Sequence, residues 1–440
     1  MESPSRLVSS FLKSQVWLTL TLLVIAAFPQ LILAQSNFGR TDAEYVLEII
    51  KVDVKKNYYD PEFHGIDLEA RFKTAKDKLK TASSGSQMMA IIAQVLLDFD
   101  DSHLFFLPPG RSNQTDYGWE MKAVGEDVFI STVKPSSDAD AKGLREGDRV
   151  ISVGGFQPAR DNLWKIQYLF NSISPKLSLH LEVRSPDGKE RAVDVAARVR
   201  QGRQVMDLTG RDITDYKIKV DQAERMKRSR SVNAGTDVLV WKLPSFAVDK
   251  SEIDAMIGRA RKYKSLVLDL RGNGGGYVDT CERLVGSFFD KEINMAERKG
   301  RKKMKPMKSD RVSDPYHGKL AVLIDSESAS AAEVFARVIQ IEKRGIVRGD
   351  RSAGAVMEAV TYPHELGLNN VIPYAVEVTD ADLIMADGKS LEKTGVTPDE
   401  LLLPSPADML AGKDPVLARA TGLLGVPLTP EQAGKLFPIE

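Results

Sequence analysis

The sequence predicts an α/β protein, in which a layered core of strands and helices carries an N-terminal helical segment and an inserted β-rich unit. Three observations lead to this prediction. Apolar residues recur at helical spacing within residues 41–97, short strands and glycine turns fill about residues 117–199, and strands then alternate with helices. We divide the chain into a leader (1–34), a helical segment (35–110), a β-rich unit (111–201) and an α/β core (202–440).

The leader has the pattern of a secretory signal peptide. Two basic residues precede an almost wholly apolar run at residues 16–34, and small Ala34 at its end suits signal peptidase. Cleavage would leave a mature chain that starts near Gln35. A run of this length could instead stay as a membrane anchor, although Pro29 interrupts it. We expect a secreted or periplasmic protein, with membrane attachment as the alternative if the leader is not cleaved.

Composition narrows the classes of partner. The chain has 61 basic and 61 acidic residues, so it has no global field that would attract nucleic acid or membrane lipid. Residues 298–308 are a local basic exception, which we interpret as a solvated loop. Cys281 is the single cysteine, so no internal disulfide can form and packing must supply the stability of an exported chain.

The helical segment is predicted from Tyr45, Ile49 and Val52 and from the apolar stretch at residues 88–97, with Asp42 as a possible N-cap. These spacings indicate helices with one apolar face each.

The end of this segment places a histidine at an element boundary. The chain runs out of the helix through an acidic stretch into Ser102-His103 and then into three apolar residues. A histidine at such a boundary is either structural or a proton acceptor, and this segment alone leaves both interpretations open.

The β-rich unit contains a passage, ADAKGLREGDRVISVGG at residues 139–155, that resembles a PDZ domain. A small helix ends at Gly143, a turn follows at Gly147-Asp148, and a strand leads to a second glycine turn. The resemblance implies that the unit binds an extended peptide, often a C-terminus, by adding it to a sheet edge.

The carboxylate-binding loop of such a domain would lie at residues 118–121. Gly118, Trp119 and Met121 are therefore the candidate peptide-binding residues. Glu120 is a poor neighbour for a peptide carboxylate, so the ligand stays undetermined.

In the core, strands are expected at residues 238–243 and 266–270, with a helix at 253–263 between them. The second strand leads into DLRGNGGGY at residues 269–277. This loop lacks the Lys-Ser/Thr ending of a phosphate cradle, and Tyr277 stands where a dinucleotide fingerprint needs glycine. It is either a nest of amide donors for an anionic oxygen or a plain tight turn.

Ser330 is the best candidate for a nucleophile. It lies between an apolar strand and an apolar-faced helix in KLAVLIDSESASAAEVFARVIQ, residues 319–340, where a hydroxyl can be exposed at a helix N-terminus. Ser330 and Glu333 also fit a capping box. The small neighbours Ala329 and Ala331 leave room for a substrate carbonyl, which favours the catalytic interpretation.

The glycine strand and the serine helix together resemble the C-terminal processing (tail-specific) serine proteases and their relative, the tricorn core protease. The resemblance covers most of the mature chain in order: helical segment, PDZ unit, glycine strand, nucleophile helix. It implies a crotonase-like layered core and a serine endopeptidase, in which Ser330 matches the middle serine of a Ser-Ala-Ser-Ala-(Ser/Ala)-Glu run.

The chain departs from most of that family at the base. The family places a lysine in a Phe-Gly-Lys-Gly context, and the matching stretch here, GDRSAGAV at residues 349–356, has Ala355 at that position. A methyl group cannot accept a proton. The tricorn-like branch instead uses a histidine next to a serine at the end of the helical segment, which implies His103 as base beside Ser102.

The same branch supplies a carboxylate from a Glu-x-x-Gly-Val-x-Pro-Asp stretch. It matches LEKTGVTPD at residues 391–399, so Glu392 is the candidate, acting through Ser102. Its alternative role is a surface ion pair with Lys389 or Lys393. Glu358 is a reserve acid.

These residues define a mechanism and its alternative. His103 takes the Ser330 proton, and the amides of Ala331 and of Gly275 or Gly276 hold the oxyanion during attack on a peptide carbonyl. No metal or other cofactor is required, and the partners are protein or peptide substrates. The alternative is an inactive, protease-like scaffold that binds peptides through its PDZ unit. The sequence does not determine the oligomeric state.

Overall fold

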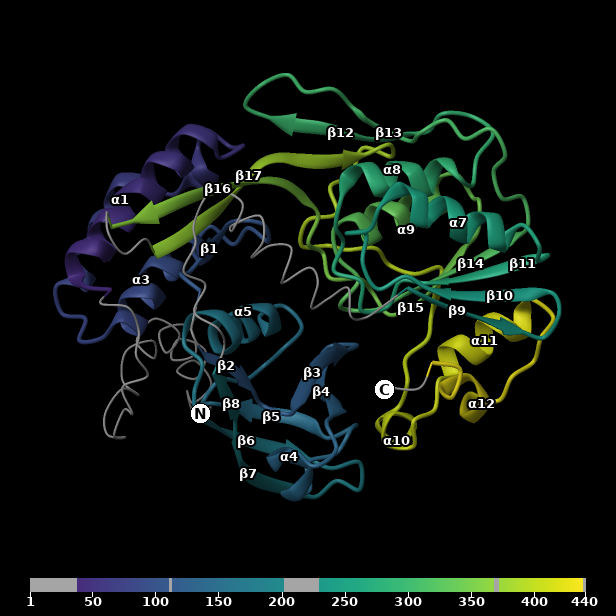
Figure 1. The fold of residues 1–440 in the computed structure, drawn as a ribbon, viewed down its shortest axis with the longest axis horizontal. Coiled ribbons are helices and arrows are strands. Elements are labelled where there is room, and N and C mark those ends of the chain that lie inside the picture. The colour runs from purple at the N-terminus through teal and green to yellow at the C-terminus, as the bar shows by residue number, and fades with distance from the viewer. Residues whose placement is uncertain (1–37, 111–112, 202–228, 368–371, 438–440) are drawn as a thin grey trace, which may run out of the picture. The chain divides into compact units, whose positions relative to one another are not determined.

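The computed structural model describes residues 38–110, 113–201, 229–367 and 372–437, and every structural statement below concerns these residues. The predicted leader lies outside them. The chain is a mixed α/β protein, as predicted (Figure 1). In the part of the chain that the structure describes, no helix has the length and apolar character needed to cross a membrane.

The helical segment contains three α-helices and a short 3-10 turn that share one apolar core. They are α1 (Arg40–Asn57), η2 (Phe63–Gly65), α2 (Leu68–Leu79) and α3 (Gly85–Leu97). Asp42 is not the N-cap of α1. Gly39 has that place, and the Asp42 carboxylate accepts from its amide at 2.9 Å.

The apolar face predicted for α1 is wrong, although the helix itself is confirmed. Tyr45 is 52% exposed and Val52 is 53% exposed. A different stripe of the same helix is buried: Ala43, Val46, Leu47, Ile50 and Val54. The side chains of Tyr45 and Val52, from which this helix was predicted, therefore point away from the core.

The β-rich unit is a five-stranded antiparallel sheet in the order β3-β4-β5-β6-β7. Its strands are β3 (Trp119–Val124), β4 (Asp127–Val133), β5 (Arg149–Val153), β6 (Ser178–Arg184) and β7 (Glu190–Ala196). The helices are α4 (Asp138–Ala141) and α5 (Leu163–Tyr168), and α5 continues into a π-helical turn, η3 (Leu169–Ile173). A two-stranded ribbon of β2 (Asn113–Asp116) and β8 (Arg198–Gln201) flanks the unit in sequence.

The core sheet has six strands in the order β18-β15-β14-β11-β10-β9, all parallel except the edge strand β9. They are β9 (Arg230–Ala234), β10 (Val238–Lys242), β11 (Ser265–Asp269), β14 (Lys319–Ile324), β15 (Ile346–Gly349) and β18 (Glu400–Leu401). Such parallel strands are buried on both faces, which explains the continuous apolar runs in the sequence.

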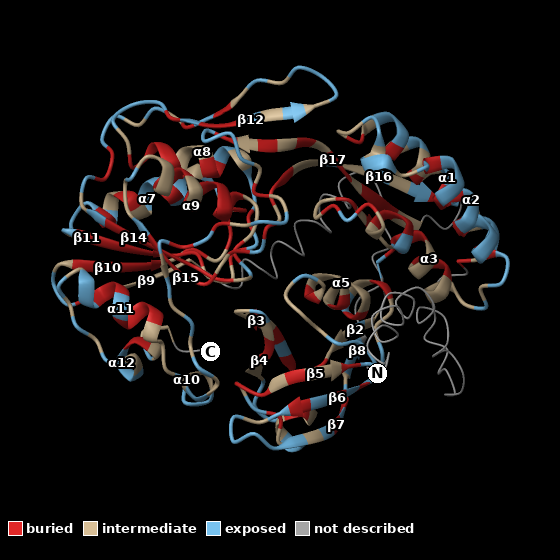
Figure 2. Cartoon of the chain, turned by 180° about the vertical axis from the view of Figure 1, so that it is seen from behind, coloured by how far each residue is buried: buried red, intermediate tan, exposed pale blue. Residues whose placement is uncertain are grey.

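Helices cover both faces of this sheet (Figure 1), and alternate residues of its strands pack toward one helical layer or the other. Leu239 and Trp241 of β10 pack toward helices α7 (Lys250–Ala260), α8 (Val278–Gly286) and α9 (Ala331–Ile341). Val238 and Val240 pack toward α11 (Pro415–Leu423) and α12 (Pro430–Gly434). Figure 2 shows the buried residues concentrated on the strands between these layers.

A second sheet joins the helical segment to the core through its long strand β17 (Ile372–Met385). β1 (Phe105–Leu107), β12 (Asn294–Gly300) and β16 (Met357–Leu366) each pair with β17. β1 begins two residues after His103, and β16 begins two residues after Ala355. Pairing with one strand thus brings these distant segments onto the same sheet.

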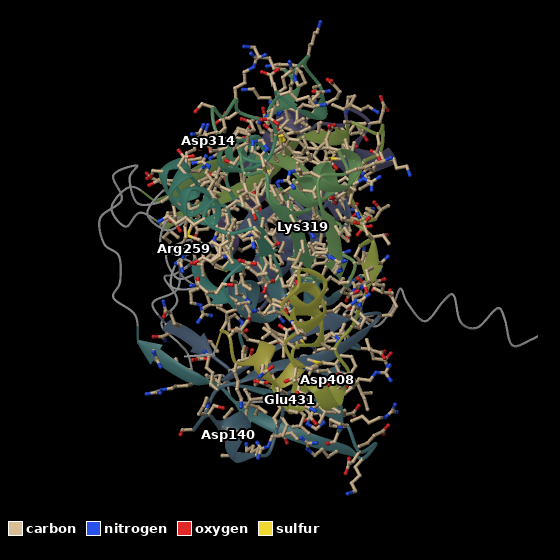
Figure 3. The ribbon with its side chains drawn as sticks, turned by 90° about the vertical axis from the view of Figure 1, so that its right-hand side faces the viewer. Asp140, Arg259, Asp314, Lys319, Asp408 and Glu431 are labelled. Carbon is tan, nitrogen blue, oxygen red and sulfur yellow. The ribbon has the colours of Figure 1, made fainter. Side chains whose placement is uncertain are left out.

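Two remaining features complete the fold. The basic stretch forms a hairpin of β12 and β13 (Met307–Lys308), so it is more structured than the predicted loop. Near the C-terminus, Asp408 belongs to α10 (Pro406–Leu410) and Glu431 to α12, and Figure 3 shows both on this part of the surface. Glu431 pairs with Lys413 at 2.7 Å, while Asp408 accepts from the Ser405 amide at 3.0 Å.

Candidate active site

Ser330 occupies a strained turn between β14 and α9. Its backbone has φ 52° and ψ −118°, a region that side-chain-bearing residues seldom adopt. Glu333 and Ser330 have the outline of a capping box, but the Glu333 amide bonds to the Ser330 carbonyl oxygen at 2.9 Å, and the Ser330 hydroxyl makes no capping hydrogen bond. The hydroxyl therefore lies at the start of a helix without serving as its cap.

The Glu333 carboxylate holds the neighbouring loop against this helix start. It accepts from the Ser330 amide at 3.1 Å, the Ser352 hydroxyl at 2.6 Å, the Gly354 amide at 2.8 Å and the Ala355 amide at 2.9 Å. Burial raises the pKa of Glu333 to about 7, against the effect of these donors. One side chain thus positions both the nucleophile turn and the 352–355 loop.

The glycine loop packs directly on Ser330. A Cβ at Gly275 would lie 2.7 Å from the Ser330 Cβ and 3.2 Å from the Ala331 nitrogen, so only glycine fits there. The Gly275 amide donates to the Asn273 side chain at 2.8 Å, and the Asn273 carbonyl accepts from Ala329 at 2.9 Å. Gly276 lies against the backbone of the 246–247 segment.

Ser102, His103 and Glu392 form a chain of short hydrogen bonds. The Ser102 hydroxyl donates to Glu392 Oε2 at 2.8 Å, and the Ser102 amide donates to Glu392 Oε1 at 3.0 Å. The same hydroxyl lies 2.8 Å from His103 Nδ1. Since its one proton goes to Glu392, its oxygen accepts from Nδ1–H, which leaves the lone pair of the imidazole on Nε2.

Two consecutive residues connect this chain to Ser330. The Val356 amide donates to Glu392 Oε2 at 2.9 Å, and the Ala355 carbonyl accepts from the Ser330 amide at 2.8 Å. Burial raises the pKa of Glu392, although the hydrogen bonds from Val356 and Ser102 oppose that shift. Ala355, at the position that matches the family lysine, is therefore bonded to the serine turn.

Asp101 is a further site residue that the sequence reasoning missed. It is 1% exposed and accepts from the His103 amide at 2.8 Å, the Tyr58 hydroxyl at 2.9 Å and the Thr379 hydroxyl at 2.7 Å. Burial raises the pKa of Tyr58, which keeps its hydroxyl a donor. The signal was the acidic run at residues 98–101, to which we assigned no role.

Other candidate residues lie in different surroundings. Glu358, the reserve acid, pairs with Arg298 at 2.6 Å. Lys393, one alternative partner of Glu392, pairs instead with Asp100 at 2.6 Å.

The candidate peptide-binding residues contribute little side-chain surface. Trp119 and Met121 belong to the apolar core of the β-rich unit. The Gly118 amide is bonded to Asp116 at 2.9 Å, and the Met121 carbonyl accepts from Gln167 at 2.9 Å. A peptide could contact this segment mainly through the remaining backbone groups of β3.

Comparison with known proteins finds a family that part of the chain resembles. The profile of peptidase family S41 matches residues 237–402, which include the glycine loop, the serine helix and Glu392. This part of the chain is therefore similar to peptidase family S41. The resemblance to C-terminal processing proteases is thereby confirmed.

Two relatives of this chain have descriptive names. The tail-specific protease of Haemophilus influenzae is 25% identical over 306 residues, which are 65% of this chain and 41% of that protein. A probable CtpA-like serine protease of Staphylococcus aureus is 25% identical over 370 residues, 83% of this chain and 64% of that protein. The chain spans less than two thirds of the length of both relatives.

Solved structures share the fold. Mature CPAF, in complex with lactacystin, superposes with a TM-score of 0.62 at 15% identity, covering 84% of this chain and 95% of that chain. The photosystem II D1 C-terminal processing protease gives a TM-score of 0.50 at 20% identity, covering 83% and 93%. Within the described residues of this chain, no group of three His, Cys, Asp or Glu side chains has the arrangement of a metal site.

Proposed function

We propose that this chain is a serine endopeptidase of the S41 type that cleaves extended or C-terminal segments of proteins, with Ser330 as nucleophile and His103 as base. The observation that carries the proposal is the hydrogen-bonded chain from Glu392 through Ser102 to His103, which leaves Nε2 of the imidazole basic. Two consecutive residues connect this hydrogen-bonded chain to the serine turn. The Ala355 carbonyl accepts from the Ser330 amide, and the Val356 amide donates to Glu392.

In the proposed reaction, His103 Nε2 accepts the Ser330 proton as the hydroxyl oxygen attacks the peptide carbonyl. The imidazolium keeps its Nδ1–H bond to Ser102, and the Glu392 carboxylate stabilises the new charge through that hydroxyl. The imidazolium then protonates the leaving amine, and water attacks the acyl-enzyme with His103 again as base. Ser102 and Glu392 act as positioning residues.

The oxyanion is assigned to two backbone amides. Ala331 opens α9, where the amides are free of intrahelical partners and carry partial positive charge. Between the two glycines, Gly276 is the better donor, because the Gly275 amide is already bonded to Asn273. This favours one of the alternatives that the sequence left open.

Ala355 stands where most family members have a lysine as the base, so that base is missing here. Another lysine near the serine loop is a poor substitute for it. Lys122 lies 3.5 Å from Asp325, in the segment before Ser330. Burial lowers the pKa of Lys122, but the charges of Asp325 and Glu327 and the hydrogen bond to Asp325 together outweigh burial, so the pKa is raised. Lys122 stays protonated and cannot act as base at neutral pH.

Export by the leader and peptide binding by the β-rich unit, as a PDZ-like domain, complete the proposal. The strands and glycine turns of the unit support the PDZ assignment. The edge of β3 would receive the peptide as an added strand. The leader supports a secreted or periplasmic location, or membrane attachment if it is retained.

Labelling with a fluorophosphonate probe tests the proposal. We expect the probe to label the wild type and Lys122→Met at Ser330. It should not label Ser330→Ala or His103→Ala. Peptide cleavage should rise with pH across about pH 5 to 8, where an imidazole loses its proton. An unlabelled wild type would instead favour the peptide-binding scaffold, and labelling that depends on Lys122 would indicate a lysine base.

A further inference from the structure

The β12–β13 hairpin concentrates positive charge on one edge of the second sheet. Residues 298–308 include seven lysines and arginines and no acidic residue, in a chain whose formal net charge is zero. Three of these cations support the fold. Arg298 pairs with Glu358 at 2.6 Å, Lys308 pairs with Glu292 at 3.0 Å, and Arg301 donates to the Lys55 carbonyl at 2.9 Å.

The other four cations have no such role. Lys299, Lys302, Lys303 and Lys305 are exposed and form no ion pair with any carboxylate among the described residues. Like charges held close together repel one another, and this repulsion is relieved when an anionic partner binds. The hairpin therefore presents a cluster of unpaired lysines to solvent.

An apolar stripe of α1 ends beside this cluster. Tyr45, Ile49, Val52 and Lys56 are spaced i, i+4, i+7 and i+11, so they line one face of the helix, opposite its buried face. Tyr45 and Val52 are each more than half exposed, at 52% and 53%. Arg301 fixes the hairpin to the last turn of α1 through its bonds to the carbonyls of Lys55 and Tyr58.

Both parts are exposed in the structure, as Figure 2 shows for the hairpin and for the outer side of α1. We call the four hairpin lysines together with Tyr45, Ile49, Val52 and Lys56 the hairpin–α1 surface. We propose that the hairpin–α1 surface binds the face of an anionic phospholipid bilayer, with the lysines at the headgroups and the apolar stripe at the interface.

The composition of the surface favours a bilayer over an acidic polypeptide. Lysine clusters attract anionic lipids, and each lysine close to such a surface improves binding roughly fivefold. Outward tyrosine and aliphatic side chains beside them fit the boundary between headgroups and acyl chains. An acidic polypeptide would use the lysines but would give the exposed Tyr45 and Val52 no specific partner.

Co-sedimentation of the full chain with vesicles tests the proposal without any need for peptidase activity. We compare phosphatidylcholine vesicles with an equimolar mixture of phosphatidylcholine and phosphatidylglycerol. The wild type should bind the anionic vesicles far more tightly, and salt should weaken that binding. A variant with Lys299→Gln, Lys302→Gln, Lys303→Gln and Lys305→Gln should bind them more weakly by on the order of a hundredfold or more.

A matched control separates local from global charge. Lys176, Lys262, Lys319 and Lys435 are exposed and lie on four other parts of the chain, so their replacement by Gln removes the same charge elsewhere. This control should keep its binding to anionic vesicles. Tyr45→Ser with Val52→Ser should remove the part of the binding that persists at high salt.

Three results would overturn the proposal: equal binding to anionic vesicles by wild type and hairpin variant, an equal loss in the scattered control, or binding of poly-glutamate without binding of anionic vesicles. Cleavage of a soluble peptide serves as a separate readout, because the hairpin lysines are not part of the proposed active site. A hairpin variant that cleaves normally but does not bind vesicles supports the surface whether or not the assigned mechanism holds.

Discussion

At the scale of single residues, the Ser102 hydroxyl decides how His103 can act. It has one proton to donate, and Glu392 takes it at 2.8 Å, so the imidazole must offer Nδ1–H to the serine. The basic nitrogen is then the one that does not face Ser102. A serine between histidine and carboxylate thus does the orienting that a carboxylate does directly in a Ser-His-Asp triad.

This arrangement gives a first prediction. Glu392→Gln removes the negative charge and places an amide N–H₂ against a donor, so kcat should fall on the order of 100-fold while KM changes little. Ser102→Ala should behave similarly, and Ser102→Thr, which keeps the hydroxyl, should recover most of the rate. Steady-state kinetics with a peptide substrate measures these changes, and an unchanged kcat in Glu392→Gln would remove that carboxylate from the mechanism.

Glu333 gives a second prediction, about stability. Burial raises the pKa of Glu333 to about 7, above the value of about 4.5 in the unfolded chain. The folded state therefore binds a proton more tightly, and the stability from this group is present below pH 4.5 and is lost as pH rises to about 7. The expected loss is about 3 kcal/mol.

Urea unfolding at pH 5 and pH 8 measures this effect. Because Gln does not titrate, Glu333→Gln should show a smaller drop in unfolding free energy between the two pH values than the wild type. Glu252→Gln, at an exposed position of α7, is the control and should keep the wild-type drop. Parallel pH dependences in wild type and Glu333→Gln would contradict the prediction.

At the scale of elements, substitutions at two adjacent glycines test whether the glycine loop holds Ser330 in place. Gly275 has φ +96°, and a Cβ there would lie 2.7 Å from the Ser330 Cβ, whereas a Cβ at Gly274 would have no neighbour within 4 Å. Gly275→Ala should lose about 1 to 3 kcal/mol of stability and abolish fluorophosphonate labelling. Gly274→Ala should resemble the wild type in both measurements. Equal effects of the two substitutions would mean that the loop adapts and does not hold Ser330.

Periodicity predicted most elements but could not choose their faces. The strands at β10 and β11 and the helix α7 lie where the alternation placed them, because buried parallel strands carry uninterrupted apolar runs. In α1, however, two apolar stripes have helical spacing, and the sequence does not say which one meets the neighbouring helices. We chose Tyr45, Ile49 and Val52, while the stripe through Val46 and Ile50 forms the core.

The site could be predicted only in part for a related reason. Ser330 was named from its place between an apolar strand and a helix, but the roles of His103 and Glu392 came from a family pattern, because no local spacing relates residues so far apart in the chain. Asp101 and the several donors of Glu333 depend on segments that meet only in the folded state. The sequence alone does not show which aspartate and glutamate side chains become buried and which stay at the surface.

At the scale of the whole molecule, one arginine fastens the β-rich unit beside the active-site loop. Arg160 is 9% exposed, pairs with Asp350 at 2.5 Å and donates to the carbonyls of Gly125 at 2.6 Å and Arg351 at 2.9 Å. Burial raises the pKa of Asp350, against the charge of Arg160. The pair therefore links the hairpin between β3 and β4 to the segment that leads to residues 352–355.

Removing one partner should cost more than removing both. Arg160→Met leaves a buried carboxylate without its cation, and we expect a loss of about 3 to 5 kcal/mol in unfolding free energy together with lower peptidase activity. Adding Asp350→Asn should restore a large part of both. Chemical denaturation of the two single variants and the double variant forms a mutant cycle, and strictly additive losses would show that the two side chains do not interact.

The pairing of β1, β12 and β16 with the one strand β17 has a consequence during synthesis. A nascent polypeptide that has left the ribosome only as far as Ser330 holds both the hydroxyl and the imidazole, yet it lacks the strand that gathers them and the carboxylate of Glu392. Under the proposed mechanism, such a half-made chain would be unable to digest itself or its neighbours, and cleaving power would emerge only after translation had passed Glu392 and the chain had folded.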